Sequence, residues 1–400
     1  MEKNYDVVVI GAGAVGSSVA YYASRDGLSV ALLDENAISS GASAHATGFL
    51  SNTYDYDPGN NINDLLFESS KLFDQDVPRI NELSGIDCLS VVKPGLRLAL
   101  TESEIETLKE RANFTSVRQR YPFYFMSGEE TRKLDNRLSH NILAAGYIPL
   151  ETQIDSYKFT LALAVSAEKQ GTDIYQRKAV GLIKNNDRVI GVTRQSGKIY
   201  GDNIVVCSGI GSNPLLQELG LGININPLKG QSIRMSYSGE PLGFHFGGVE
   251  SWHLIHRGDD LISAGSTSEF NNYDEPPNHK ATETILNWVM SVMPCLEDAR
   301  IVETMYGFRP MSPDNLPIVG ALPTLKGIYL AIGHGHKGIH LSLVTGEIIK
   351  SLLIKGYADY NIGFMNLGTS GTKQMLAVHS ISLIMRCIKR RPRARNRAIT

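Results

Sequence analysis

The feature that most restricts the fold of this sequence is an apolar strand that runs directly into a glycine-rich loop, within residues 5–16. The apolar run ending at Ile10 predicts a strand buried on both faces. Gly11 permits a tight turn, Gly13 lets the backbone approach a pyrophosphate, and Gly16 lets the following helix pack closely on the strand. The N-terminus of that helix then faces the phosphates, so the segment predicts a dinucleotide-binding turn.

The residues after the loop complete the expected βαβ unit. Small and aromatic residues at 17–25 suit a helix lying on a sheet, Gly27 ends it, and residues 29–33 form a second buried strand. Asp34 closes this strand about twenty residues beyond the loop, where a carboxylate accepts hydrogen bonds from a ribose. The alternative is a glycine turn beside a surface acid that lies there by chance, and the complete unit favours the dinucleotide site.

Length and composition are typical of a globular protein with two or more domains, since the chain has 400 residues. The first strand follows Met1 so closely that no signal peptide fits before it, and no apolar run approaches the length of a membrane span. We therefore expect a cytoplasmic protein. The cysteines form no CxxC pair, which fits unpaired thiols and indicates no metal site: they are Cys88, Cys207, Cys295 and Cys387.

Charge is unevenly distributed along the chain. The net charge is −2, and residues 386–400 hold seven basic side chains and no acid, so the preceding part carries −9 (−2 minus 7). This basic end follows a fairly apolar stretch at 375–385 and could touch the acidic inner face of a membrane weakly. A loosely docked tail is the simpler interpretation, and no nucleic-acid partner is expected.

Local patterns predict further elements along the chain. Apolar spacing predicts a helix over 64–83, and short strands are expected near 90–100 around Pro94. Cap-like residues at 101–104 open another helix, and a helix rich in Ala and Leu runs from Asp155 to about residue 169.

Two segments carry residues suited to a bound ligand. Residues 39–48 are small apart from His45, and such a run lets backbone lie against a flat ring or a phosphate. Residues 179–193 predict a β-hairpin, and a strand over 203–207 ends in Ser208 and Gly209. Because dinucleotide folds bind ligands at the carboxyl ends of strands, we expect Ser208 and Gly209 near the cofactor.

Five motifs lie far apart in the chain: the glycine loop, Asp34, the small-residue loop at 41–43, the strand end near 205–212, and residues 307–320, which begin Gly-Phe-Arg-Pro. In their order they resemble the motifs of the D-amino-acid oxidase superfamily, most of all glycine and sarcosine oxidases and D-amino-acid dehydrogenases. The resemblance spans roughly residues 5–355. It implies an α/β fold, with a Rossmann-like FAD-binding domain and a discontinuous α+β substrate domain built on an antiparallel sheet.

The resemblance also implies boundaries for these domains. The FAD-binding domain is expected to comprise residues 1–50, 150–220 and 305–360, and the substrate domain residues 51–149 and 221–304. Residues 361–400 form the basic C-terminal tail.

Cofactor contacts transfer from the family position by position. The pyrophosphate would lie against the glycine loop, the adenosine ribose at the acidic strand end, the adenine at Val180, and the flavin ring near the glycine-rich turn at 333–339. The residues implied are Gly11, Gly13, Ala14, Val15, Gly16, Asp34, Glu35, Ser40, Gly41, Ala42, Ser43, Thr47, Gly48, Val180, Ser208, Gly209, Gly307, Arg309, Gly333, Gly335, His336, Lys337, Gly338 and Ile339.

The mode of FAD attachment and the catalytic residues follow from the same motifs. Flavin-linking members of the family carry a Cys at the position of Gly307, so noncovalent FAD is expected. Arg309 matches the family Arg whose planar fork suits a substrate carboxylate, although an arginine in a surface ion pair is the simpler alternative. His45 and His336 are catalytic candidates, and each could instead be a packed or solvated ring.

The activity that the resemblance implies is oxidation of the C–N bond of an amino acid or secondary amine by hydride transfer to FAD, with hydrolysis of the imine. A 2-hydroxy-acid dehydrogenase of the same fold is the first alternative, and a flavin-binding assembly protein without turnover is the second. The electron acceptor could be oxygen, a quinone or a protein. The substrate and the oligomeric state stay open.

Overall fold

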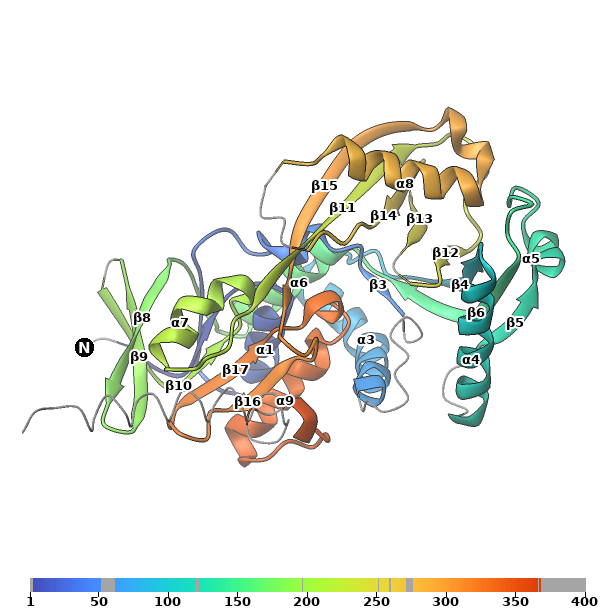
Figure 1. Cartoon of the computed structure of the whole chain (residues 1–400). Helices are drawn as coiled ribbons and strands as arrows, with labels where there is room; N and C mark the ends of the chain where they lie inside the picture. Colours follow the sequence, from blue (N-terminus) through green and yellow to red (C-terminus); the bar gives the residue numbers. More distant parts are fainter. Residues whose placement is uncertain are drawn as a thin grey trace, which may run out of the picture.

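The computed structural model describes residues 3–51, 62–118, 122–195, 197–250, 252–258, 260–270, 276–365 and 367. Over these residues the chain forms two β-sheets flanked by helices (Figure 1). Two long strands, β11 (Asn226–Ser236) and β15 (Arg300–Met311), reach from the second sheet toward the first. Of the predicted C-terminal tail, 361–400, residues 361–365 and 367 are described, and the rest, with its basic end at 386–400, lies outside the described residues.

The first sheet has a parallel centre. Its pairings β1–β2, β2–β7, β1–β10 and β10–β17 are parallel, whereas β16 and the β8–β9 hairpin pair antiparallel at its margins. The central strands are apolar on both faces, as expected for a sheet covered on both sides. In spatial order the strands are β16 (Ile318–Ala321), β17 (Ile328–Ile332), β10 (Gly197–Val206), β1 (Asn4–Ile10), β2 (Val30–Asp34) and β7 (Asp173–Gln176). Off this path, β9 (Arg188–Arg194) pairs with β10, and β8 (Ala179–Asn185) pairs with β9.

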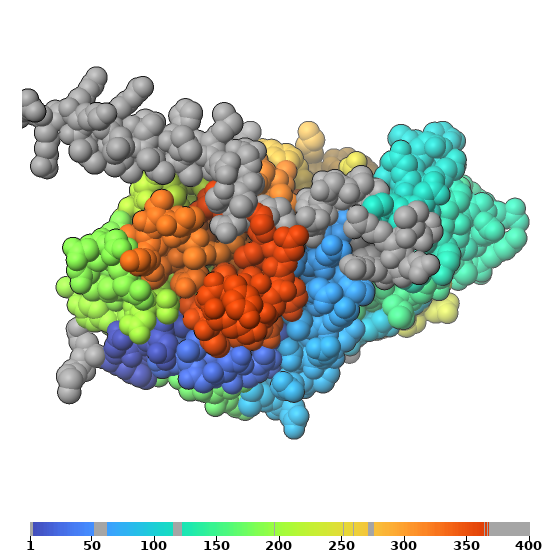
Figure 2. Space-filling view, turned by 90° about the horizontal axis from the view of Figure 1, so that it is seen from below, coloured from blue at the N-terminus to red at the C-terminus, as the bar shows by residue number. Residues whose placement is uncertain are grey.

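Helices cover one face of this sheet and the hairpin covers part of the other. The helical face is packed by α1 (Ala14–Arg25), α3 (Ile62–Ser84), α6 (Ser156–Lys169) and α9 (Ser342–Lys355), and α7 (Asn213–Glu218) lies on the hairpin side. Figure 2 shows the orange-red C-terminal elements lying directly against the blue N-terminal residues, although more than three hundred positions separate them in the sequence.

The second sheet is mostly antiparallel, and β12 with β4 is its parallel pair. Its outer face packs on α8 (His279–Val292), and α4 (Glu102–Arg118) and α5 (Gly128–Leu134) lie near β4, β5 and β6. From β15 and β11 the order continues through β14 (Leu261–Gly265), β13 (His253–Gly258), β12 (His245–Gly248), β4 (Val91–Ala99), β6 (Ala144–Gln153) and β3 (Phe49–Leu50), with β5 (Tyr124–Ser127) on β6.

Short helices fill several connections. α2 (Ala42–His45) follows β2, and 3₁₀ helices lie at Gly209–Ser212 (η1), Pro294–Asp298 (η2), Gly335–Lys337 (η3) and Gly363–Met365 (η4). The glycine-rich turn at 333–339 therefore leads into α9 through η3 rather than directly.

The predicted fold class, a Rossmann-like sheet with a second, largely antiparallel sheet, is confirmed. The helix after Asp155 is also confirmed, and the Asp155 side chain caps it by accepting from the Lys158 N–H at 2.8 Å. The expectation of separate short strands around Pro94 is wrong. β4 is continuous there, because the register with β6 shifts between Lys93 and Gly95 and this irregularity accommodates a residue that has no N–H to donate.

Sheet membership does not by itself divide the chain into domains, so the predicted boundaries stay predictions.

In the part of the chain that is described, no helix combines the length and the apolar character needed to cross a bilayer.

Candidate cofactor and substrate site

A cavity of about 1600 Å³ lies where the parallel strands of the first sheet end. β1, β2, β10 and β17 all point their carboxyl ends to the same edge, which places Gly11, Asp34, Ser208 and Gly333 on its wall. Strands of the second sheet form the opposite wall. Because a pocket for one drug-sized ligand holds about 300–1,000 Å³, this volume suits a large cofactor together with a substrate.

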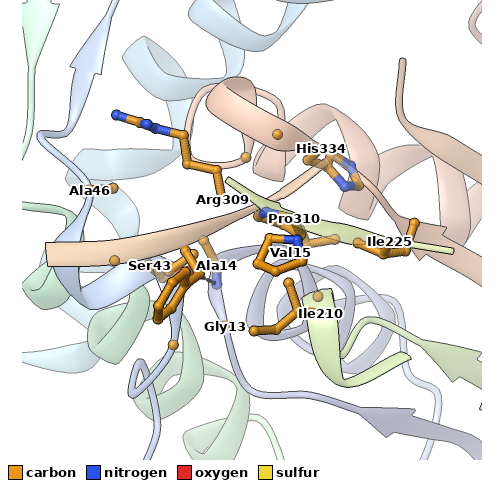
Figure 3. Close-up of a pocket in the computed structure, with 18 of the residues that line it drawn as sticks. Gly13, Ala14, Val15, Ser43, Ala46, Ile210, Ile225, Arg309, Pro310 and His334 are labelled. Atoms are coloured by element: carbon orange, nitrogen blue, oxygen red, sulfur yellow. Dashed lines mark hydrogen bonds between the residues drawn. The ribbon is translucent and has the colours of Figure 1, made fainter. Parts of the chain in front are cut away.

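The glycine loop is built so that backbone forms the cavity wall. Gly11 has a φ of +106°, and a Cβ there would come within 2.6 Å of the Cys207 carbonyl oxygen. α1 begins directly after Gly13, which is its N-cap residue. Because glycine has no side chain, the N-cap residue cannot bond the first N–H groups of the helix. Ser43 approaches from α2 and accepts a hydrogen bond from the Ala14 N–H at 3.0 Å, as Figure 3 shows. The arrangement fits an anionic group at the start of α1.

Asp34 accepts a hydrogen bond from the glycine loop and also lines the cavity. Its carboxylate accepts hydrogen bonds from the Ala12 N–H at 2.7 Å and the Asn36 N–H at 2.9 Å. Burial raises the pKa of Asp34, and these backbone hydrogen bonds oppose that shift. Glu35 lines the same cavity but forms an exposed ion pair with Lys178 at 2.6 Å.

We expect Asp34→Ala to weaken FAD binding by about 1–3 kcal/mol, the scale of hydrogen bonds to a charged group. Isothermal titration of apoprotein with FAD measures the change, and turnover per bound flavin should be retained. Glu35→Ala is the matched control, because an exposed ion pair contributes little. Unchanged affinity in Asp34→Ala with a loss in Glu35→Ala would move the ribose contact to Glu35.

α2 and β15 meet at one end of the cavity. A Cβ on Gly307 would lie 2.9 Å from the His45 Cβ, so the absence of a side chain at 307 is what admits His45. The imidazole stacks on Tyr306 with ring centroids 6.2 Å apart. Burial lowers the pKa of His45, with a smaller opposing effect of Glu303, so the ring is largely uncharged at neutral pH.

The glycine-rich turn closes the other end of the cavity. Met311 at the end of β15 forms a β-bridge with His334, so β15 extends along the cavity from Gly307 to this turn. His334 is buried and bonds Thr345 through Nε2 at 3.0 Å, and both His334 and His336 line the cavity.

Arg309 lies on β15 between these two ends. Its guanidinium packs on Gly230, because a Cβ added to Gly230 would lie 2.5 Å from the guanidinium atoms. Nη1 donates to the Thr267 carbonyl at 3.0 Å and Nη2 to Ser266 Oγ at 2.6 Å. Burial lowers the pKa of Arg309 to about 10, which leaves it charged at neutral pH. Figure 3 shows the side chain extending from the strand above the residues of the glycine loop.

Most predicted site residues line this one cavity. Gly16 and Gly48 do not: a Cβ on Gly16 would collide with the Gly11 carbonyl, and one on Gly48 with the Ile154 carbonyl, so both fit backbone packing behind the wall. Those on the wall are Gly11, Gly13, Ala14, Val15, Asp34, Glu35, Ser40, Gly41, Ala42, Ser43, His45, Thr47, Val180, Ser208, Gly209, Gly307, Arg309, Gly333, Gly335, His336, Lys337, Gly338 and Ile339.

The second sheet adds wall residues beyond the predicted site residues. They are polar or aromatic and lie near Arg309 or on the strands beside it: Gln231, Ser232, Trp252, His253, Ser266 and Tyr306. Trp252 and His253 belong to an alternating pattern at 252–257 that predicts a strand lining the substrate cavity but not which of its faces points inward. The structure places both residues on the wall, with β13 paired to β14. Among the described residues, no group of three or more His, Cys, Asp or Glu side chains could hold a metal ion.

Comparison with known proteins agrees with this architecture. A glycine oxidase of Bacillus licheniformis is 26% identical over 357 residues, which cover 88% of this chain and 94% of the relative. The crystal structure of a glycine oxidase from Bacillus cereus superposes with a TM-score of 0.84 at 27% identity, covering 89% of this chain and 96% of that one. A glycine oxidase structure from Geobacillus kaustophilus has a TM-score of 0.87 at 23% identity, with coverages of 92% and 98%, and supports the fold alone.

A further relative belongs to another activity class within the same superfamily. A D-amino acid dehydrogenase of Paramagnetospirillum magneticum is 32% identical over 216 residues, 53% of this chain and 51% of the relative. The profile described as "FAD dependent oxidoreductase" (DAO) matches residues 6–352. The chain therefore belongs to the DAO family of FAD-dependent oxidoreductases.

Proposed function

We propose that this protein oxidises the C–N bond of an amino acid or secondary amine, using FAD as the hydride acceptor. The observation that carries the proposal is Arg309, a half-buried cation held by Ser266 and Thr267 on the cavity wall between the glycine loop and the glycine-rich turn. A half-buried guanidinium on a cavity wall is suited to a carboxylate, because its fork can donate two parallel hydrogen bonds.

The residues present fit FAD. Gly11, Gly13 and the N-terminus of α1 suit the pyrophosphate, and the Asp34 carboxylate suits a ribose. The half-exposed Val180 lies at the hairpin side of the cavity, as an adenine contact requires. The backbone N–H groups of the turn at 333–338 suit the negative charge that a reduced flavin carries.

In this mechanism the protein supplies position and electrostatic field. Arg309 binds the substrate carboxylate, and its two hydrogen bonds to Thr267 and Ser266 fix the guanidinium before the substrate arrives. FAD, when bound, accepts the hydride from the carbon that bears the nitrogen. No side chain needs to act as a general base if the amine binds uncharged, and the imine product hydrolyses in water.

An anaerobic screen of amino acids, N-methyl amines and 2-hydroxy acids tests this function by loss of flavin absorbance. Bleaching by amines supports the proposal. Bleaching by hydroxy acids alone would replace it with a 2-hydroxy-acid dehydrogenase, and no bleaching by any compound would favour a flavin-binding assembly protein. Rates of reoxidation by air, a quinone analogue and an electron-transfer protein then identify the acceptor class.

The purified protein is expected to be yellow and to release its FAD on acid precipitation. The reason is Gly307, which has no side chain to form a thioether with the flavin. Absorbance at the flavin band, measured in supernatant and pellet, provides the test. Colour that stays in the pellet would contradict noncovalent binding.

A further inference from the structure

His253 occupies an inward-facing position on the substrate side of the cavity. β13 pairs with β14 so that His253 lies opposite Gly265, and the side chain is only 4% exposed. A Cβ on Gly265 would be 2.8 Å from Ser232 Cβ and 3.1 Å from His253 Cε1, so the imidazole packs directly against Gly265. The next residue after that glycine is Ser266, which holds Arg309 at 2.6 Å.

The imidazole of His253 has unused hydrogen-bonding capacity. Its one hydrogen-bonding contact among the described residues is from Nε2 to Ser263 Oγ, at 3.5 Å, which is the outer limit of such a bond. Nδ1 has none within the same residues. Nδ1 is not one of the fully buried side-chain atoms, and His253 lines the cavity, so an unbonded imidazole nitrogen on this wall is open to a ligand group as its partner.

The electrostatic surroundings keep this imidazole uncharged. Burial lowers the pKa of His253 to about 3, and the nearby cations Arg257 and Arg309 add to the effect. A neutral imidazole has one nitrogen that accepts and one that donates. Near Arg309, Ser266 Oγ and the Thr267 carbonyl each accept a hydrogen bond from the guanidinium.

We infer that His253 accepts a hydrogen bond from the substrate nitrogen while Arg309 holds the substrate carboxylate. The two side chains flank the Gly265–Ser266 segment, so together they can fix both ends of an α-amino acid and thereby aim the carbon between them. This inference rests on the proposed function and narrows its substrate class. Primary and secondary amino acids offer an N–H in the neutral form, and tertiary amines do not.

Two isosteric variants test the inference, His253→Leu and His253→Asn, in the full-length protein loaded with FAD. Binding is followed by the flavin absorbance change, with a reactive amino acid found in the anaerobic screen and with propionate, a carboxylate that lacks nitrogen. His253→Leu should weaken amino-acid binding about tenfold, the scale of one lost hydrogen bond, and leave propionate binding unchanged. His253→Asn keeps an acceptor and should retain most of the affinity.

His245 provides a matched control. It is also a buried histidine of the second sheet whose pKa burial lowers, to about 4, but it does not line the cavity. His245→Leu should therefore leave the ratio of amino-acid to propionate affinity at the wild-type value.

The outcomes separate this inference from the proposed function. If amines bleach the wild-type flavin but His253→Leu binds the amino acid as tightly as wild type, the inference is overturned and the function stands. Equal losses for the amino acid and for propionate would also overturn it, because His253 would then shape the wall only. If no amine bleaches the wild-type flavin, the proposed function fails first and the inference fails with it.

Discussion

Replacing Arg309 with lysine is expected to lower kcat/KM for amino-acid substrates by an order of magnitude or more, which is about 1.4 kcal/mol of transition-state stabilisation or greater. Lysine keeps the positive charge but loses the planar fork. A single ammonium cannot bond Thr267, Ser266 and a carboxylate in the geometry that the guanidinium provides. Steady-state kinetics with an artificial electron acceptor measures the effect.

Arg234→Lys is the matched control for this change. Arg234 lies on β11 of the same sheet, forms a partly exposed ion pair with Glu303 at 2.7 Å, and does not line the cavity. Its substitution should leave kcat/KM within twofold, since such pairs contribute about 0–1 kcal/mol. Amines without a carboxylate should be indifferent to Arg309→Lys. Equal losses for substrates with and without a carboxylate would show that Arg309 has another role.

The cofactor half of the site could be predicted from the sequence because its determinants are local. The loop from Gly11 to Gly16 and the acidic residue Asp34 lie within one βαβ unit. The need for a glycine or an acid at each of these positions can be inferred from residues close by in the sequence. Asp34 shows the limit of this reading. Its place at the end of β2 was predicted, and its ribose role stays a prediction. Its bond to the Ala12 N–H was not predicted, since that bond depends on how the loop folds back over β2.

The substrate half depends on contacts between distant segments, which no local pattern encodes. His45 fits only because Gly307, more than 250 positions later, has no side chain. His253 was part of an evident strand, yet a strand alternates between two faces, and only pairing with Gly265 shows which face meets the cavity. Arg309 was identified through a family motif, whereas its supports Ser266 and Thr267 emerge from the sheet register.

Gly11→Ala is expected to abolish FAD retention and to lower the free energy of unfolding by more than about 1–3 kcal/mol, the cost of backbone strain alone. Gly11 has a φ of +106°, which an L side chain rarely adopts. The added Cβ would also lie 2.6 Å from the Cys207 carbonyl oxygen and 2.8 Å from Ser208 Cα. Both contacts are with backbone, so β1 and β10 would have to move apart where the pyrophosphate is expected.

Gly27→Ala separates the two causes. Gly27 has a similar φ of +91° at the other end of α1, but a Cβ there would meet nothing within 4 Å, and the residue does not line the cavity. In chemical denaturation, the free energy of unfolding of this variant should therefore fall only by the cost of backbone strain. The variant should also keep its flavin after gel filtration. If both variants lost the same stability and both kept FAD, the close approach of Gly11 to the end of β10 would have no part in forming the cofactor site.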